Sequence, residues 1–486
     1  MVRRLRLTRA RLAGDGGDPV DVTLADGRVV AIGAAAGGAD RVETVDLEGR
    51  WVLPGLADNH VHLLHWAKAS RRLDLSGTES AAEAVALVAR RLAGAREVVG
   101  YGFRDALWQD VPTVAALDEA AGETPVVLVS GDLHCAWLNS AALRRHGLDP
   151  VQGLVREEPA FAVMRKIDDV GDATMDAWAV EALGRAAARG VTRITDLEMR
   201  WGFDDWARRA AAGPLPVRVD VGFYAPDLER VVGSGWRTGD PVAGTAGRAS
   251  VGPLKIITDG SLNTRTAWCV DPYPGLGPDE NPYGVASVPY DVLVPLLATA
   301  TAGGLRVAVH AIGDRANQVA LDAFEATGAT GSIEHAQLLL GEDVARFARL
   351  GVVASMQPEH AMDDRDVADR YWHGRTDRAF RLRDLHAAGV TLALGSDAPV
   401  APLDPWITMA AAVTRSRDGR EPWHPEQAVD LATALRASTG GVGVLTAGLP
   451  ADLTVIERDP FTASGDDLRA MRIWGTMLAG EWTYRA

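Results

Sequence analysis

The stretch LRVAVHAIGDRANQVALDAFEATGATGSIEHAQ, residues 305–337, decides the fold of this chain. It contains two short apolar runs, 305–314 and 331–337, joined by an Ala- and Leu-rich segment with the composition of a helix. Apolar strands that alternate with helical segments are typical of parallel strands joined by crossover helices. The stretch therefore predicts a strand–helix–strand unit of an α/β fold.

The same unit recurs along most of the chain. We identify eight candidate strands, at residues 53–62, 190–198, 217–225, 252–260, 305–314, 331–337, 352–358 and 391–399. Eight such units predict a closed (β/α)8 barrel of the TIM type. A doubly wound open sheet is the alternative that the pattern alone leaves open.

The two ends of the chain have a different pattern. Residues 1–54 and 445–486 contain short strand-like runs separated by turn residues. Because chain termini often lie close together, we expect both ends to form one small β-sandwich domain beside a barrel of residues 55–444. The first two candidate strands are far apart in sequence. We expect an insertion at about 66–180 between them, over the barrel mouth where active-site loops lie.

Composition limits the partners and the cellular location that we expect for this protein. Of the 486 residues, 47% are hydrophobic and 24% are charged, as in a globular protein. The net charge of −15 repels phosphate backbones, so we expect no nucleic-acid partner. We find neither an apolar run that would span a membrane nor a signal peptide, and expect no membrane association. The two cysteines, Cys135 and Cys269, are far apart, which fits a cytoplasmic protein.

Four histidines lie at the predicted C-terminal ends of strands. His60 and His62 end the first candidate strand, and since alternate strand positions point to the same face, the pair can bind one metal ion. His310 and His335 end two consecutive strands, where a buried imidazole needs a hydrogen bond or a metal. Each histidine alone also fits a hydrogen-bonded core residue. Together at one end of a barrel, they indicate a metal site.

Two further residues could take part in such a site. Asp397 ends the last candidate strand; it fits an N-cap or turn residue, but beside a metal it can be a ligand and a general base. Lys255 lies in an apolar strand and is one of three lysines among 50 basic residues. Because burying an ammonium is costly, Lys255 is neutral, paired with Asp259, or converted to a carbamate. A carbamate can bridge two divalent metals, roughly 3.5–4 Å apart, that share an activated hydroxide.

Six motifs, in order, resemble those of the amidohydrolase superfamily. They are PGLADNHVH, LKIITDGSL, HAIGD, IEHAQ, SMQPEH and GSDAPV, and the tail GLPADLTVIERDP resembles the closing β-segment of that superfamily. The nearest branch is the YtcJ-like one, which includes N-substituted formamide deformylase. The resemblance spans nearly the whole chain, and the motifs are highly specific jointly.

The resemblance implies a metal site and a substrate site. The implied metal ligands, with Asp397 also as catalytic proton shuttle and Lys255 as a bridging carbamate, are His60, His62, Lys255, His310, His335 and Asp397. The first two histidines and Asp397 would hold the more buried metal, and the last two histidines the second. The implied substrate contacts are His134, Asn139, Asp259, Ser261, Arg265 and His360. Asn263 and Thr264 replace a small pair often seen in this branch, which changes the local pocket shape.

The resemblance also implies an activity. It is hydrolysis of a non-peptide carbon–nitrogen bond, in an amide or formamide, through a metal-activated hydroxide. One or two divalent ions would bind, and the mixed nitrogen and oxygen ligands suit zinc. Several of the 14 tryptophans lie in the presumed mouth loops, which favours a small apolar or aromatic amide as substrate. The same site would suit a deaminase, a cyclic-amide hydrolase or an esterase. A catalytically silent regulatory protein on the same barrel is the alternative of another functional class. The sequence does not decide whether the protein forms a homo-oligomer.

Overall fold

The computed structural model describes residues 4–33, 42–105, 108–131, 135–149, 154–156 and 158–486. The chain divides into two compact units, one of residues 1–63 with 180–486 and one of residues 64–179. No helix in these described ranges is both long and apolar enough to cross a membrane.

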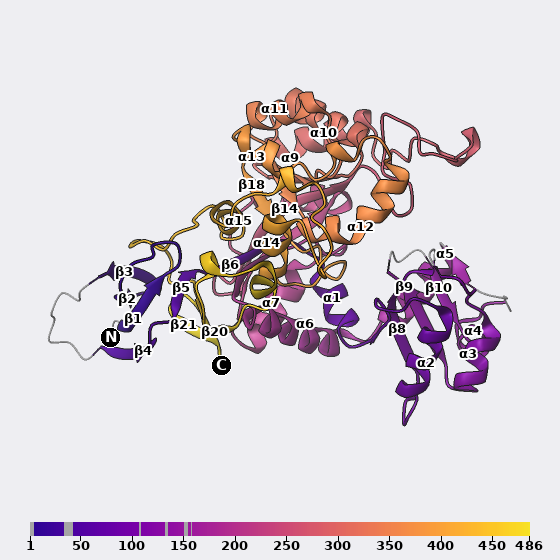
Figure 1. Cartoon of the computed structure of the whole chain (residues 1–486), viewed down its shortest axis with the longest axis horizontal. Helices are drawn as coiled ribbons and strands as arrows, with labels where there is room; N and C mark the ends of the chain where they lie inside the picture. Colours follow the sequence, from indigo (N-terminus) through magenta and orange to yellow (C-terminus); the bar gives the residue numbers. More distant parts are fainter. Residues whose placement is uncertain (1–3, 34–41, 106–107, 132–134, 150–153, 157) are drawn as a thin grey trace. The chain divides into compact units, whose positions relative to one another are not determined.

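The first unit contains a sheet of eight parallel strands (Figure 1). In spatial order they are β18 (Leu392–Leu394), β17 (Val353–Met356), β16 (Gly331–His335), β15 (Val307–Ala311), β14 (Ala249–Ile257), β13 (Arg218–Tyr224), β12 (Val191–Asp196) and β6 (Leu56–Val61). Each strand overlaps one of the eight segments predicted from the sequence, and from β12 to β18 neighbours in the sheet are also consecutive strands along the chain. The prediction of eight parallel strands is therefore confirmed.

The two outer strands of this sheet approach each other and nearly close the barrel. Val61 and Ala398 form a parallel bridge, and the backbone N–H of Asp397 donates to the carbonyl of His60 at 2.8 Å. The N–H of His62 donates to the carbonyl of Ala398 at 2.9 Å. The barrel is thus a (β/α)8 arrangement, and the open-sheet alternative is excluded. Its closing contacts lie at the residues expected to carry the chemistry.

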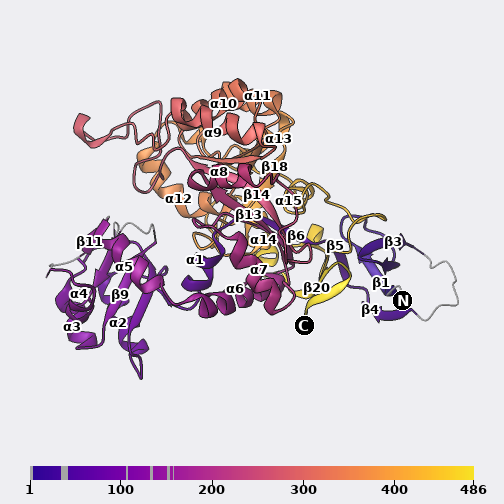
Figure 2. The same ribbon diagram turned by 180° about the vertical axis from the view of Figure 1, so that it is seen from behind.

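Helices connect the strands and cover the outside of the barrel. They include α7 (Phe203–Ala212), α8 (Leu228–Gly233), α9 (Tyr290–Ala302), α10 (Asp314–Thr327), α11 (Gly341–Leu350), α12 (Pro358–Tyr371), α13 (Leu382–Ala387) and α14 (Pro405–Thr414). Helices α9, α10 and α11 lie side by side in both views (Figures 1 and 2). Helix α10 buries Ala316, Ala320 and Phe324, whose spacing of four residues forms one helix face. It ends at Gly328, whose φ of 62° is the left-handed conformation of a helix C-terminus.

The two chain ends form one connected sheet. Its strands are β1 (Arg4–Leu12), β2 (Val20–Ala25), β3 (Arg28–Ile32), β4 (Glu43–Asp46), β5 (Trp51–Pro54), β19 (Leu453–Ile456), β20 (Ile473–Leu478) and β21 (Glu481–Arg485). Strand β5 pairs with β1 on one side and β19 on the other, and Leu7 and Val52 share a core with Leu453 and Val455. The expected pairing of the ends is present. However, this sheet groups with the barrel in one compact unit rather than as a separate β-sandwich domain.

The second unit, residues 64–179, lies in the chain between β6 and β12. It contains a five-stranded sheet in the order β11 (Leu154–Arg156), β10 (Cys135–Leu138), β9 (Val126–Ser130), β8 (Val98–Phe103), β7 (Leu73–Asp74). The helices of this unit include α2 (Ala81–Arg91), α3 (Val114–Ala121), α4 (Ser140–His146) and α5 (Glu158–Asp168). Two apolar clusters, which include Phe103 and Trp137 in one and Val129 and Leu138 in the other, give this unit its own core.

Candidate metal centre

The end of β6 forms the first group of metal-ligand side chains. Nε2 of His60 lies 3.5 Å and Nε2 of His62 lies 3.4 Å from Oδ1 of Asp397, so the three predicted residues come together. His60 is 1% exposed. Asp397 has a φ of 57°, a left-handed conformation that non-glycine residues adopt rarely and that often marks functional sites. These side chains offer two imidazole nitrogens and a carboxylate, a donor set that suits zinc.

A second group shares the same carboxylate. His335, at the end of β16, and His360, in the first turn of α12, lie with Asp397 in a buried cluster. Nε2 of His360 is 3.8 Å from Oδ2 of Asp397. Within the described part of the chain, Nδ1 of His335 and Nε2 of His360 are buried without a hydrogen-bond partner. Buried polar atoms are normally satisfied, so unpartnered imidazole nitrogens beside a carboxylate fit a metal site.

His310 was expected to bind a metal ion together with His335, but its imidazole also contacts other polar groups. The two rings meet edge to face with 4.5 Å between centroids, so the residues are neighbours. Nε2 of His310, however, lies 3.3 Å from Oδ1 of Asp259 and 3.3 Å from the carbonyl of Gly260. The donor group around His335 instead contains His360, which the sequence resemblance assigned to substrate.

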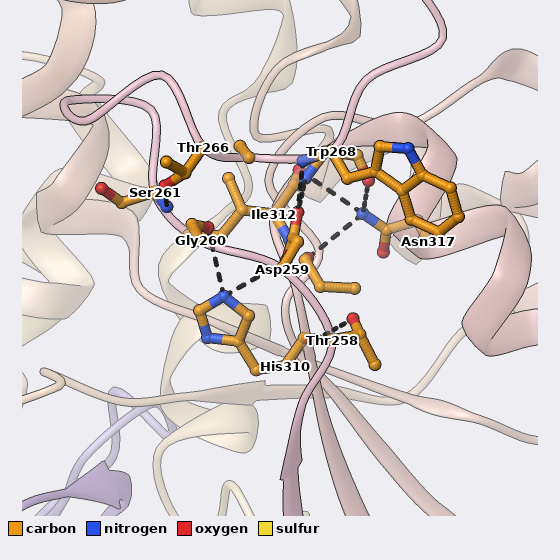
Figure 3. A network of polar contacts seen from close by, with 12 residues as sticks. Thr258, Asp259, Gly260, Ser261, Thr266, Trp268, His310, Ile312 and Asn317 are labelled. Atoms are coloured by element: carbon orange, nitrogen blue, oxygen red, sulfur yellow. Dashed lines mark hydrogen bonds and ion pairs between the residues drawn. The ribbon is translucent and has the colours of Figure 1, made fainter. Parts of the chain in front are cut away.

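Asp259 anchors the loop that follows β14 (Figure 3). Its carboxylate accepts backbone N–H groups of Trp268 at 2.8 Å, Ile312 at 3.0 Å and Gly313 at 2.8 Å. A Cβ atom on Gly313 would lie 1.9 Å from the carbonyl oxygen of Trp268, so only glycine permits this approach. Asp259 is 1% exposed and accepts three backbone N–H groups, so it holds the loop in place, and its expected contact with substrate stays a prediction. Among the described residues, the ion-pair partner of Asp259 is His310 rather than Lys255.

Lys255 lies in β14 and is 2% exposed. Its Nζ is 3.4 Å from Nε2 of His60, so the structure brings Lys255 next to one of the predicted metal ligands. Burial lowers the pKa of the Lys255 amine. The neutral amine is the form that can react as a nucleophile.

Burial also sets the protonation of the histidines. It lowers the pKa of His60 to about 4, and Lys255 contributes in the same direction. Burial likewise lowers the pKa of His335 well below its ordinary value. Both imidazoles are therefore neutral near pH 7, which is the form that binds metals.

The remaining predicted substrate contacts differ in their surroundings. Ser261 and Thr264 share a hydrogen bond of 2.9 Å within the loop after β14, and Arg265 lies over the ring of Tyr371 at 5.5 Å. Asn139 is fully buried and caps α4: its oxygen accepts two backbone N–H groups and its NH₂ donates to two carbonyls. All four hydrogen bonds go to backbone groups, so Asn139 is the N-cap of α4, and its expected contact with substrate stays a prediction. His134 lies outside the described residues.

Sequence reasoning missed three buried polar residues at the centre. Oε2 of Glu334 lies 2.7 Å from Nδ1 of His60, and Nε2 of Gln357 lies 3.4 Å from the same atom. Asp58 accepts the backbone N–H groups of His60 and Ser396, and burial raises its pKa to about 7. Asp58 could have been found, because it precedes His60 by two positions and so shares its strand face.

The fold and the donor set together define a class. A parallel barrel that carries histidine and aspartate side chains at the C-terminal ends of its strands is the arrangement of metal-dependent barrel hydrolases. The chain belongs to the amidohydrolase family, whose family model matches residues 43–484. This match confirms the resemblance inferred from the six sequence motifs.

Relatives cover nearly the whole chain. It is 28% identical to Protein LONG AFTER FAR-RED 3 of Arabidopsis thaliana, over 95% of this chain and 88% of that protein. It is 28% identical to putative amidohydrolase YtcJ of Bacillus subtilis, over 92% and 91%. It is 26% identical to N-substituted formamide deformylase of Arthrobacter pascens, over 95% and 94%. A solved structure, an uncharacterized metal-dependent hydrolase from Pyrococcus furiosus, is 26% identical with a TM-score of 0.77, over 94% of this chain and all of that one.

Proposed function

We propose that this chain hydrolyses a non-peptide carbon–nitrogen bond in a small amide or formamide, with divalent metal bound at its candidate centre. The observation that carries the proposal is the position of Asp397, whose two carboxylate oxygens face different histidines. Oδ1 faces His60 and His62, and Oδ2 faces His360. One carboxylate thus belongs to both donor groups, which supports a centre for one or two ions.

His60, His62 and Asp397 would hold one ion, and His335 with His360 and the same carboxylate would hold a second. When bound, a divalent metal polarises the substrate carbonyl and lowers the pKa of the attacking water. Asp397 takes the proton of that water and delivers it to the leaving nitrogen, as a general base that then acts as a general acid.

Lys255 is proposed to act as a carbamate. In its unprotonated form, the amine would attack carbon dioxide, forming a nitrogen–carbon bond and releasing one proton to water. The product carries two oxygens and a negative charge, so it can bridge two cations where an amine cannot. Its supports are the position of Nζ beside His60 and the lowered pKa of the amine.

The substrate is proposed to be apolar on its nitrogen side. The deformylase of Arthrobacter pascens is named for N-substituted formamides, which supports this class of substrate. Met199 follows β12 and is 62% exposed, and Val400 follows β18 and is 45% exposed. These strands flank β6, so two exposed apolar side chains belong to the loops next to His60 and His62. Apolar surface at such a position suits a hydrophobic substituent.

The experiment is a metal analysis followed by a substrate panel. The panel contains N-formyl and N-acyl amines with aromatic or alkyl substituents, a cyclic amide, an aminopurine and an ester. We expect turnover of a formyl or acyl amine by metal-loaded protein and none after metal removal. Preferred turnover of another class would replace the amide assignment. Bound metal with no turnover of any class would favour the silent regulator.

A further inference from the structure

We propose that Glu334 is a positioning residue of the metal centre, which holds His60 in the tautomer that presents its Nε2 lone pair to a metal. Glu334 lies on β16 and His60 on β6, and β17 and β18 separate these strands across the contact that closes the barrel. Oε2 of Glu334 and Nδ1 of His60 are nevertheless 2.7 Å apart, with both side chains at most 3% exposed. The inference rests on the proposed metal-dependent function.

The geometry of this contact determines where the imidazole proton lies. A carboxylate oxygen accepts hydrogen bonds, so Nδ1 of His60 must carry the proton that it donates to Glu334. The other carboxylate oxygen, Oε1, accepts the hydroxyl of Ser332, so both oxygens act as acceptors. Nε2 of His60 is then left with its lone pair. That atom is the one facing Asp397 at 3.5 Å and Lys255 at 3.4 Å.

Gln357 is the competitor for the same nitrogen. Its Nε2 can only donate, and it lies 3.4 Å from Nδ1 of His60 and 3.3 Å from the carbonyl of Ser355. A hydrogen bond from Gln357 would require the opposite tautomer, with the proton on Nε2 of His60 and no lone pair for a metal. The 2.7 Å contact with Glu334 is within the normal hydrogen-bond range, whereas 3.4 Å is beyond it. Glu334 therefore decides the tautomer, and its removal leaves Gln357 as the remaining partner.

A carboxylate that accepts from the distal nitrogen of a ligating histidine is a recurrent feature of metal sites. Loss of such a partner weakens metal affinity or activity by about 10–100-fold. Glu334 has no direct access to substrate in this role, since it acts through His60. Glu334→Gln is the informative variant, because it preserves side-chain shape while its amide can donate to Nδ1.

The experiment compares zinc affinity in the wild-type chain and Glu334→Gln, by competition of Zn²⁺ with a chelator at constant pH. We expect about 10–100-fold weaker zinc binding in the variant. Nitrogen NMR of ¹⁵N-histidine-labelled, metal-free protein gives a second readout. The His60 signal, assigned by its loss in His60→Gln, is expected to show the Nδ1–H tautomer in wild type and the Nε2–H tautomer in Glu334→Gln.

Two further variants separate positioning from simple destabilisation. Asp343→Asn removes a fully buried carboxylate of α11 that is paired with Arg346, and we expect unchanged zinc affinity. Ser332→Ala removes the hydroxyl that donates to Glu334, and we expect zinc binding to be several-fold weaker. If Glu334→Gln does not fold, this variant tests the positioning role of Glu334 instead. Unchanged zinc affinity and an unchanged His60 tautomer would overturn the role of Glu334. A wild-type chain that binds no zinc would overturn the proposed function, while the tautomer in metal-free protein still tests Glu334.

Discussion

Asp397→Asn should abolish most of the activity while leaving the fold intact. In the variant, one oxygen of residue 397 becomes an NH₂ group. If the NH₂ takes the Oδ1 position, it faces Nε2 of His60 and His62 at about the wild-type 3.5 and 3.4 Å; if it takes Oδ2, it faces His360 at 3.8 Å. Either orientation removes an acceptor from one donor group. Neither can hold the proton of the attacking water.

We therefore expect kcat to fall by at least about two orders of magnitude, equivalent to about 2.7 kcal/mol in activation free energy. Asparagine tolerates the left-handed backbone at this position, where φ is 57°. The backbone hydrogen bond from residue 397 to the carbonyl of His60 is also retained. The melting temperature should therefore change little.

The assay is steady-state kinetics on the best N-formyl or N-acyl substrate, with metal content measured on the same samples. Asp404→Asn is a matched control, because Asp404 is 7% exposed against 8% for Asp397 but caps α14 and pairs with Arg189 at 2.6 Å. We expect the control to lose stability by about 1–2 kcal/mol and to keep its kcat. Near-normal activity of Asp397→Asn would refute the proton-transfer role.

Three other substitutions test separate parts of the account. Lys255→Ala should lose activity and bound metal, and a short carboxylic acid added in solution should partly restore both. The control Lys166→Ala, in the unit of residues 64–179, should change neither activity nor bound metal. Full activity of Lys255→Ala would contradict the carbamate. Asn139→Ala should lower the free energy of unfolding of that unit by about 1–3 kcal/mol, measured in urea, without changing kcat. A stable variant with lower kcat would instead support a contact between Asn139 and the substrate. Asp259→Asn should destabilise the chain by about 1–3 kcal/mol, because the NH₂ group would face a backbone N–H whichever oxygen it replaces. An unchanged melting temperature would argue against the anchoring role of Asp259.

The barrel could be predicted because its signals are local. Each barrel strand overlaps a short apolar run, and helical segments lie between most of these runs, so strand identity needs no tertiary information. Asp58 and His60 alternate along β6, His62 follows directly after it, and Asp397 follows the last strand, so parallel strand direction alone brings them to one end of the barrel. The organisation of the chain ends was harder to predict, because short strands that pair with one another do not reveal whether their sheet forms a domain separate from the barrel.

The rest of the site depends on contacts between distant parts of the chain. Glu334 meets His60 from a position 274 residues away, and no local pattern distinguishes it from a surface glutamate. His360 joins the centre because α12 begins at Pro358 directly after β17, which turns its first helical turn toward Asp397. Asn139 is the opposite case: a residue before an Ala-rich helix reads as an N-cap from sequence alone, and the structure has it in that role.

The most direct test of the central claim is the number of metal ions bound to each chain. Protein expressed with added zinc and purified without chelator should contain between one and two transition-metal ions per chain by elemental analysis. That result would agree with the two donor groups that share Asp397. A chain that folds normally but contains no metal would contradict the proposal of a metal-dependent hydrolase.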